Sequence, residues 1–256
     1  MEKEEYLKMY NLETSYWWFL GKQHLVKNQL GRLPLKRLNE IRLLDIGSGT
    51  GIIMKELQNL GRVYGMELSM EAIGFLKRRN LNLIVRSDAN DALPFRDETF
   101  AVITCLDVLE HLDKDIDLIR EMFRICKPGG YVLLTVPAFQ AFWSLHDTVL
   151  HHRRRYTKIR LLATLKQADF RVMKISYYNV TMSIPIMVIR KIRALWLPDA
   201  NSQSDFSIKL PFLFNHALTH LYRAEISLLR FLSYPFGVSL VAALQRPEKK
   251  SQGGKS

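Results

Sequence analysis

The segment Leu43-Leu-Asp-Ile-Gly-Ser-Gly-Thr-Gly51 decides the fold of this chain of 256 residues. Arg42 to Ile46 reads as a buried strand, and Ile52 to Leu60 has the apolar spacing of a helix. Between them glycine stands at every second position, which permits a tight turn and a close approach of the backbone to a ligand. The segment therefore predicts a strand, a ligand-binding turn and a helix.

The same alternation of short apolar runs and helical patterns continues to residue 136 and predicts a parallel sheet built from βαβ units. The expected strands here are Val63–Met66, Leu83–Arg86, Phe100–Leu106 and Tyr131–Val136, the expected helices are Met70–Arg79 and Asp115–Cys126, and Lys127–Gly130 is expected to be a turn. Further along, we expect a helix at Thr157–Ala168 and strands at Phe170–Tyr178 and Val238–Gln245.

The pattern divides the chain into four parts. Residues 1–40 are expected to form an N-terminal helical cap, and residues 41–179 with 238–246 the ligand-binding core. Residues 180–237 are expected to be a helical insertion that covers the substrate, with helices at Ile184–Leu197 and Phe212–Leu232. The polar residues 247–256 are expected to be a disordered tail.

Acidic residues follow the predicted strands in order. Asp45 precedes the glycine turn, and Glu67, Asp88 and Asp107 each end or follow a later strand. The glycine spacing is GxGxG rather than the GxGxxG of dinucleotide-binding turns. A carboxylate beside the turn disfavours a pyrophosphate and favours a zwitterionic ligand with an ammonium group. We therefore expect S-adenosylmethionine (SAM) here rather than a nicotinamide dinucleotide.

With LLDIGSGTG, the segments VYGMELS, RSDANDALPF and FAVITCLDVLEHL make residues 41–137 resemble the class I SAM-dependent methyltransferases, particularly the type 11 small-molecule group. The resemblance implies a Rossmann-like α/β fold with a seven-stranded, mostly parallel sheet, and S-adenosylhomocysteine (SAH) as product. It implies this set of cofactor residues: Asp45, Gly47, Gly49 and Gly51 around the methionine end, Glu67 and Leu68 at the ribose, Asp88 and Ala89 at the adenine, and Leu106 and Asp107 near the sulfonium.

Charge and composition restrict the partners. Residues 1–137 carry 19 basic and 19 acidic side chains, whereas residues 138–256 carry 18 and 6, so the net charge of +12 comes from the second half. Such an excess indicates an anionic partner or a solvated basic surface. The two cysteines show no metal-ligand spacing, so no metal is expected. With neither a signal sequence nor an uninterrupted apolar span, we expect a cytoplasmic protein with peripheral contact to the inner membrane face through the basic half.

The candidates for acceptor chemistry lie after the fifth expected strand. A general base must remove a proton from an oxygen acceptor, and the candidates are His111, His146, His151 and His152, of which His146 and His152 are favoured. Arginine forks bind phosphate or carboxylate in pairs of hydrogen bonds. The predicted acceptor contacts are Trp17 from an aromatic N-terminal lid, the arginines Arg153, Arg154 and Arg155, and Tyr156.

These observations predict an enzyme, a methyltransferase acting on a small-molecule or lipid-linked acceptor with an anionic group. The basic half leaves a nucleic-acid methyltransferase as an alternative, although no Asn/Asp-Pro-Pro-Tyr/Phe motif follows the fourth expected strand and no RNA-binding module is visible. A second alternative is a non-catalytic SAM-binding or membrane-associated scaffold protein. The oligomeric state and the methylated atom stay open.

Overall fold

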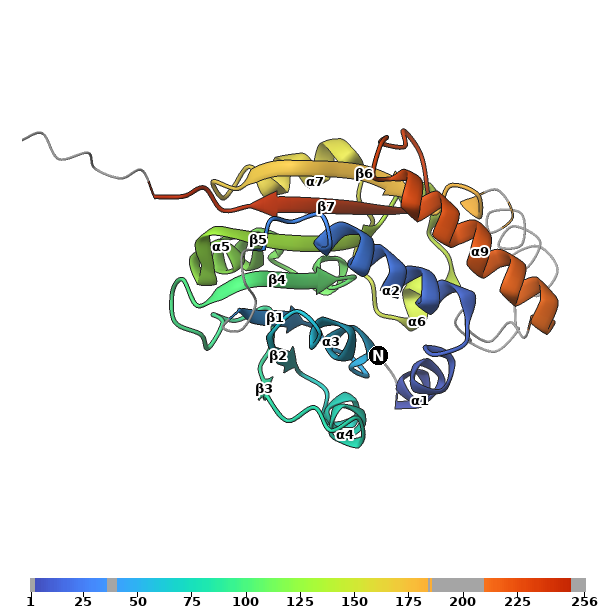
Figure 1. Cartoon of the computed structure of the whole chain (residues 1–256), viewed down its shortest axis with the longest axis horizontal. Coiled ribbons are helices and arrows are strands. Elements are labelled where there is room, and N and C mark those ends of the chain that lie inside the picture. The colour runs from blue at the N-terminus through green and yellow to red at the C-terminus, as the bar shows by residue number, and fades with distance from the viewer. Residues whose placement is uncertain (1–2, 36–40, 184, 186–209, 250–256) are drawn as a thin grey trace, which may run out of the picture.

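The computed structural model describes residues 3–35, 41–183, 185 and 210–249. Seven strands form one sheet in the order β3-β2-β1-β4-β5-β7-β6 (Figure 1). The strands are β1 (Arg42–Ile46), β2 (Arg62–Glu67), β3 (Ile84–Arg86), β4 (Phe100–Leu106), β5 (Cys126–Pro137), β6 (Arg171–Tyr178) and β7 (Ser239–Gln245). β1 to β5 pair in parallel, and β7 pairs antiparallel with both β5 and β6. The expected sheet of seven strands with one reversed strand is confirmed.

Helices cover both faces of this sheet because the central strands are apolar on both faces. Leu44 of β1 belongs to the core shared with α5 (Asp115–Ile125) and α7 (Lys158–Leu165). Its neighbour Leu43 points the other way, as successive strand residues do, into the core shared with four other helices. These are α2 (Trp17–Leu30), α3 (Ile52–Leu57), α4 (Met70–Arg78) and α9 (Phe212–Leu228).

The N-terminal cap consists of α1 (Lys3–Leu12) and α2. In Figure 1, α2 and α9 lie side by side across the front of the sheet. The ring of Tyr222 on α9 occupies the space beside Gly21 on α2, where an added Cβ would lie 1.9 Å from Cδ1 of the tyrosine. Glycine therefore permits this close approach of the two helices.

One expected element differs in the structure. The segment Lys127–Gly130, expected to be a turn, lies within β5 as a bulge: Cys126 pairs with Phe100, and the next pair is Tyr131 with Val102. Gly129 has φ +75 and donates its N–H to the Arg246 carbonyl at 2.9 Å, so the residue that follows β7 holds the bulge. The expected helix Ile184–Leu197 and most of the expected tail lie outside the described residues.

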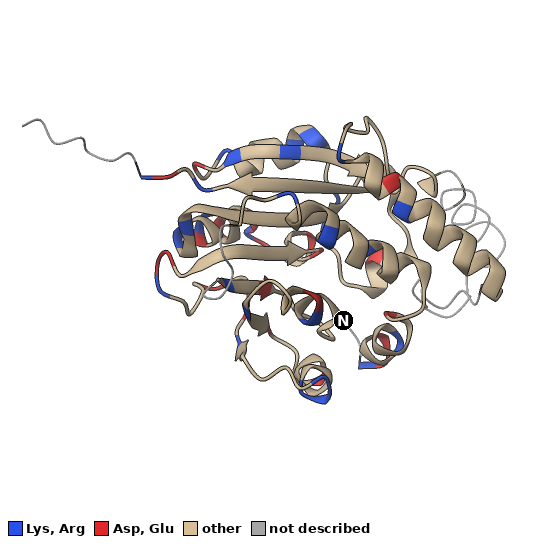
Figure 2. Ribbon diagram, in the orientation of Figure 1, with Lys and Arg blue, Asp and Glu red and all other residues tan. Residues whose placement is uncertain are grey.

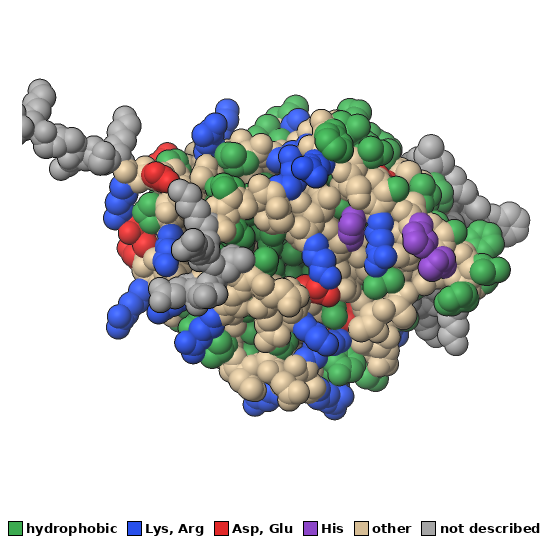
Figure 3. All heavy atoms as spheres, viewed as in Figure 1, with side chains coloured by type: hydrophobic (Ala, Val, Ile, Leu, Met, Phe, Trp, Pro, Cys, Tyr) green, Lys and Arg blue, Asp and Glu red, His purple; other side chains and the backbone are tan. Residues whose placement is uncertain are grey.

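Charged side chains are spread over the surface rather than gathered in one place. Figure 2 shows Lys and Arg on elements from both halves of the chain, with Asp and Glu among them. On the face in Figure 3, single basic side chains are separated by apolar and polar ones. No helix in the described part of the chain is both long enough and apolar enough to cross a membrane.

Candidate active site

A cavity of about 870 Å³ lies at the carboxyl ends of β1, β2 and β4. The chain order reverses between β1 and β4, and open α/β sheets bind ligands at such a switch point. The lining includes the residues expected to bind the cofactor, apart from Gly51: Asp45, Gly47, Gly49, Glu67, Leu68, Asp88, Ala89, Leu106 and Asp107.

The glycine turn shapes the floor of the cavity. Gly47 and Gly49 have φ values of +70 and +53, a region that residues with a side chain rarely adopt. A Cβ on Gly49 would meet only the Gly47 carbonyl oxygen, at 4.0 Å, so the space above it belongs to the cavity. Gly51 has a different role: its added Cβ would lie 2.6 Å from Leu76 and 2.7 Å from Leu81. Gly51 therefore lets α3 pack against its neighbours.

Glu67 ends β2 and holds the rim of the turn. One carboxylate oxygen accepts the N–H of Gly49 at 2.8 Å, and the other accepts those of Leu68 and Ser69, both at 2.9 Å. Asp88, beyond β3, accepts two hydrogen bonds from Asn90 and also lines the cavity. The two carboxylates thus stand in the wall of one cavity, where they can accept hydrogen bonds from a ligand's hydroxyl or amino groups.

Asp45 lies deeper, at the end of β1, with 2% of its surface exposed. Its Oδ1 accepts a hydrogen bond of 2.6 Å from Thr104 on the adjacent strand. Burial, opposed by this hydrogen bond and reinforced by the charge of Glu67, raises the pKa of Asp45 to about 7. A ligand ammonium group beside it would stabilise the carboxylate and lower this pKa.

Asp107 follows β4 in a left-handed conformation, with φ 53. Its carboxylate forms an ion pair with Lys22 of α2 and accepts a hydrogen bond of 2.8 Å from Thr135 of β5. Burial disfavours both charges, but Asp107 more than offsets this for Lys22, whose pKa is raised. Lys22 likewise holds the pKa of Asp107 below its usual value. The pair fixes the N-terminal cap over the switch point.

These groups fit SAM. The glycine turn leaves open space for a ligand, Glu67 and Asp88 can accept from ribose hydroxyls and an adenine amino group, and Asp45 is a buried carboxyl that a cation would relieve. A site for a pyrophosphate would instead concentrate N–H donors and positive charge.

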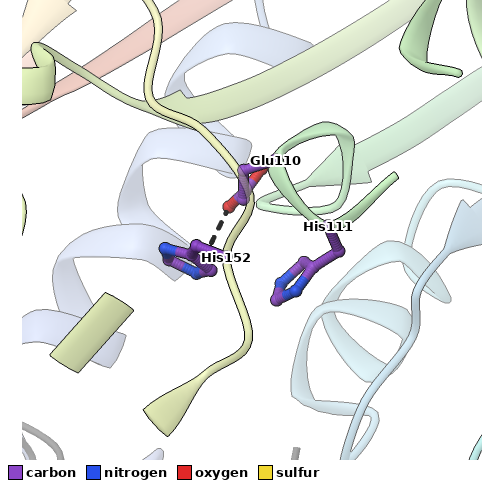
Figure 4. Close-up of side chains that lie close together, drawn as sticks. All are labelled: Glu110, His111 and His152. Carbon is purple, nitrogen blue, oxygen red and sulfur yellow. Dashed lines mark ion pairs between the residues drawn. The ribbon is translucent and has the colours of Figure 1, made fainter. Parts of the chain in front are cut away.

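Two histidines form the far end of the cavity. His111 ends the short helix η2 (Leu109–His111), and His152 follows α6 (Leu145–Val149); both line the cavity, and their ring centroids are 4.8 Å apart (Figure 4). Burial, and then the nearby His152, lower the pKa of His111 to about 4. His111 is therefore neutral at pH 7 and can accept a hydrogen bond.

A buried carboxylate orients His152. Its Nδ1 lies 2.8 Å from Oδ1 of Asp147, which Arg155 also binds through two hydrogen bonds of 2.7 and 3.0 Å. Burial opposes the charge on Asp147, but the hydrogen bonds from His152 and Arg155 hold its pKa well below the usual value. An ionised Asp147 can only accept, so Nδ1 donates, and in the neutral form of the ring Nε2 keeps its lone pair. His146 lies behind, with its ring 6.4 Å from that of His152, and is not part of the lining.

The three expected arginines lie in different surroundings. Arg153 lines the cavity, is 52% exposed at its side chain and pairs with Asp113. Arg154 lies outside the lining and pairs with Asp115 at 3.3 Å. Arg155 is buried, and its remaining nitrogen donates to the Ala138 carbonyl at 3.1 Å. Tyr156 is also buried and donates to Asp115 at 2.7 Å.

Two residues of the aromatic N-terminal segment, Tyr16–Phe19, reach the cavity. Trp18 and Phe19 line the wall, whereas the expected contact Trp17 does not. Trp17 packs edge-on against Tyr222, with the ring centroids 5.5 Å apart, and its backbone N–H donates to Oδ1 of Asn215 at 2.9 Å. No described residue of the insertion 180–237 lines the cavity.

Sequence reasoning missed two groups of the site. Lys22 stands on a helix without a motif, and only the docking of α2 over the sheet brings it to Asp107. Glu110 precedes His111 in FAVITCLDVLEHL, and nothing in the sequence marks its side chain as buried. Its side chain is in fact 0% exposed, and burial followed by the charge of Asp107 raises its pKa well above the usual value.

Comparison with known proteins identifies the core. A family model described as a methyltransferase domain matches residues 44–134. The ubiquinone biosynthesis O-methyltransferases of Burkholderia multivorans and Burkholderia ambifaria are 32% and 34% identical over 122 residues, which cover 40% of this chain and 53% of each relative. The chain thus spans about half the length of the curated relatives it matches.

Solved structures share the fold over most of the chain. A SAM-dependent methyltransferase from Thermotoga maritima superposes with a TM-score of 0.60 at 17% identity, covering 95% of each chain. The [4+2]-cyclase SpnF superposes with a TM-score of 0.55 at 17% identity, over 88% of this chain and 81% of the other. Residues 44–134 therefore form a methyltransferase domain, and the structure around them shares the fold of a SAM-dependent methyltransferase.

Proposed function

We propose that this protein transfers the methyl group of SAM to an oxygen atom of a small-molecule acceptor. One observation carries the proposal: a single cavity contains the groups suited to the cofactor and continues past Asp107 to His111 and His152. Donor and acceptor would then share one space, and methyl transfer needs the reacting atoms about 3–3.5 Å apart. When bound, SAM supplies a methyl group on a positively charged sulfur.

The chain's own residues have distinct tasks in this proposal. Asp45, Glu67 and Asp88 hold the cofactor, and the Lys22–Asp107 pair keeps α2 in place above it. His111 and His152, at the far end of the cavity, receive the acceptor hydroxyl and help to remove its proton. Between the candidate bases, the geometry favours His152, because Asp147 fixes its ring and its other nitrogen keeps a lone pair, over His146, which is not part of the lining.

The surroundings of this end of the cavity support an acceptor with an apolar ring or chain and an anionic group. Trp18 and Phe19 offer an apolar wall, and Arg153 is the member of the arginine cluster that lines the cavity. An oxygen acceptor agrees with the names of the curated relatives, which are O-methyltransferases of ubiquinone biosynthesis. A lipid-linked acceptor would also suit the exposed Phe212, Phe214 and Phe231 of the α9 region, which could meet a membrane surface.

A nucleic-acid substrate has less support. Recognition of a phosphate backbone needs basic side chains along a groove. On the face in Figure 3 they are dispersed, and Arg154 and Arg155 are engaged by Asp115 and Asp147.

The test is a turnover assay with SAM labelled in its methyl group, using quinone-precursor, glycan-lipid and RNA extracts in parallel. We expect label in a small organic or lipid-linked product together with release of SAH. Label in RNA alone would overturn the choice of acceptor. Because the shared fold also includes a protein named as a cyclase, binding of SAM by calorimetry without turnover in any extract would overturn the proposed activity.

A further inference from the structure

The far end of the cavity contains a compact set of metal-binding side chains. Glu110 and His111 are consecutive on η2, and His152 approaches from the loop after α6 (Figure 4). One ligand atom from each lies within 4.8 Å of the others. We propose that Glu110, His111 and His152 bind one divalent transition-metal ion.

Glu110 is the group that requires explanation. Its side chain is 0% exposed, and within the described part of the chain neither carboxylate oxygen has a hydrogen-bond partner. The cations nearby are committed to other carboxylates: Lys22 to Asp107 and Arg155 to Asp147. Burial of a carboxylate without a partner is costly, and coordination of a metal is one of the ways in which proteins relieve it. His152 supplies a nitrogen, Nε2, at 3.9 Å from the nearer oxygen.

Both histidines are already held in the manner of metal ligands. A metal-bound imidazole usually donates its other N–H to a carboxylate or a backbone carbonyl, which fixes the ring. His152 meets this condition through Asp147, at 2.8 Å from Nδ1. His111 forms a hydrogen bond with the backbone of His151. In His152 one nitrogen is thus fixed and the other, Nε2, faces Glu110 at 3.9 Å.

The donor set selects the kind of ion. Two imidazole nitrogens and one carboxylate suit zinc, iron(II), manganese or cobalt, whereas magnesium and calcium prefer oxygen ligands. Three protein ligands leave coordination positions open, and here His111 and His152 border the cavity. In the proposed function, on which this step rests, an acceptor hydroxyl coordinated there would lose its proton more readily. His152 would then act as a ligand rather than as the base, and the proton would pass to water in the open cavity.

The sequence predicts no metal, whereas we propose one here. The spacing of the three ligands in the sequence explains the difference. Glu110 and His111 are adjacent, but His152 lies 41 positions beyond His111 and is brought to them only by the loop after β5. Two adjacent residues and a third that is far away in the sequence do not form a recognisable motif.

The experiment measures metal binding without turnover. The full chain is stripped with EDTA and dialysed, then titrated with Co²⁺, followed by visible absorption, and with Zn²⁺, followed by calorimetry. We expect one ion per chain, Co²⁺ bands typical of nitrogen and oxygen ligands, and loss of both signals in Glu110→Gln and His152→Ala. Asp147→Asn keeps all three ligands and should weaken binding by about 10–100-fold.

A matched control comes from α9, where the exposed His216 and His220 have their Nε2 atoms 3.0 Å apart. His216→Ala should leave the tight site unchanged. Absence of stoichiometric binding in the wild type, or binding that is lost only in His216→Ala, would overturn the proposal. If Glu110→Gln does not fold, by circular dichroism, the Co²⁺ spectrum of His152→Ala decides: an unchanged spectrum refutes the site.

Methyl transfer is then assayed separately, with and without EDTA. Full transfer by metal-free protein would refute the metal's role on the acceptor and leave the methyltransferase intact. Stoichiometric binding with no transfer in any extract would refute the proposed function and leave the metal site intact.

Discussion

Replacement of Glu67 by Gln gives the sharpest test of the cofactor site. The substitution keeps the size of the side chain but removes its charge and turns one acceptor oxygen into a donor amide. Glu67 now accepts N–H groups on both oxygens, from Gly49 at 2.8 Å on one and from Leu68 and Ser69 at 2.9 Å on the other. Whichever way the new amide is turned, its NH₂ faces at least one backbone donor.

Two losses follow. The unfavourable contact should cost about 1–3 kcal/mol of folding stability, the usual penalty for a hydrogen-bonding group left without a partner. The cofactor should lose charge-assisted hydrogen bonds from its ribose, about 1.5–3 kcal/mol, which corresponds to roughly 10–150-fold in affinity.

Calorimetry with SAH measures the affinity, and urea unfolding measures the stability. Glu67→Ala should weaken binding similarly, and Glu56→Gln is the control, because Glu56 pairs with Lys27 at 2.6 Å and lies outside the cavity lining. Unchanged SAH affinity in Glu67→Gln, with the protein folded, would refute the assignment of this carboxylate to the ribose.

Three further predictions concern the same cavity. The pKa of Asp45, about 7, makes it neutral below that pH, so SAH affinity should fall about tenfold from pH 8 to pH 6, and calorimetry on Asp45→Asn should show this dependence lost. Without ligand the same raised pKa means that the folded protein holds a proton that the unfolded chain releases, so stability to urea should fall as pH rises from about 4 to about 7 in the wild type but not in the variant. Lys22→Met leaves Asp107 without its ion-pair partner. Because that carboxylate is 37% exposed, the free energy of unfolding should fall by about 1–2 kcal/mol, below the usual cost for a fully buried pair. In urea unfolding, adding Asp107→Asn to the same chain should recover part of this loss. Gly49→Ala should weaken SAH binding and add about 1 kcal/mol of backbone strain, whereas Gly51→Ala, whose Cβ meets two leucines, should mainly lower stability, by about 1–3 kcal/mol or more. Equal behaviour of the two variants in calorimetry and thermal unfolding would contradict their separate roles.

The fold could be predicted because its determinants are local. The nine residues Leu43 to Gly51 mark a strand, a turn and the start of a helix, and the apolar runs that follow mark the remaining strands within one or two residues. The exception, Lys127–Gly130, carries an ordinary turn signal. Its pairing as a bulge depends on β4 and on Arg246, which no local pattern contains.

The contacts at the far end of the cavity could not be predicted in the same detail, because ion pairs between residues far apart in the sequence determine them. A run of three arginines looks uniform in sequence, yet Asp113, Asp115 and Asp147 engage them in three different surroundings. The aromatic segment presents a similar ambiguity, since one helical step decides that Trp18 lines the cavity while its neighbour Trp17 faces Tyr222.

The contact of Gly21 with Tyr222 ties together two segments that are 201 positions apart in the chain. α2 supplies Trp18, Phe19 and Lys22 to the cavity, and α9 supports α2 from the outside. A change of residue at either position would shift the helix that carries this part of the cavity wall. In a chimera with a related enzyme, the N-terminal cap and the connection between β6 and β7 should therefore be exchanged as a pair. Transfer of one alone would bring a side chain into the space beside Gly21 that the Tyr222 ring occupies.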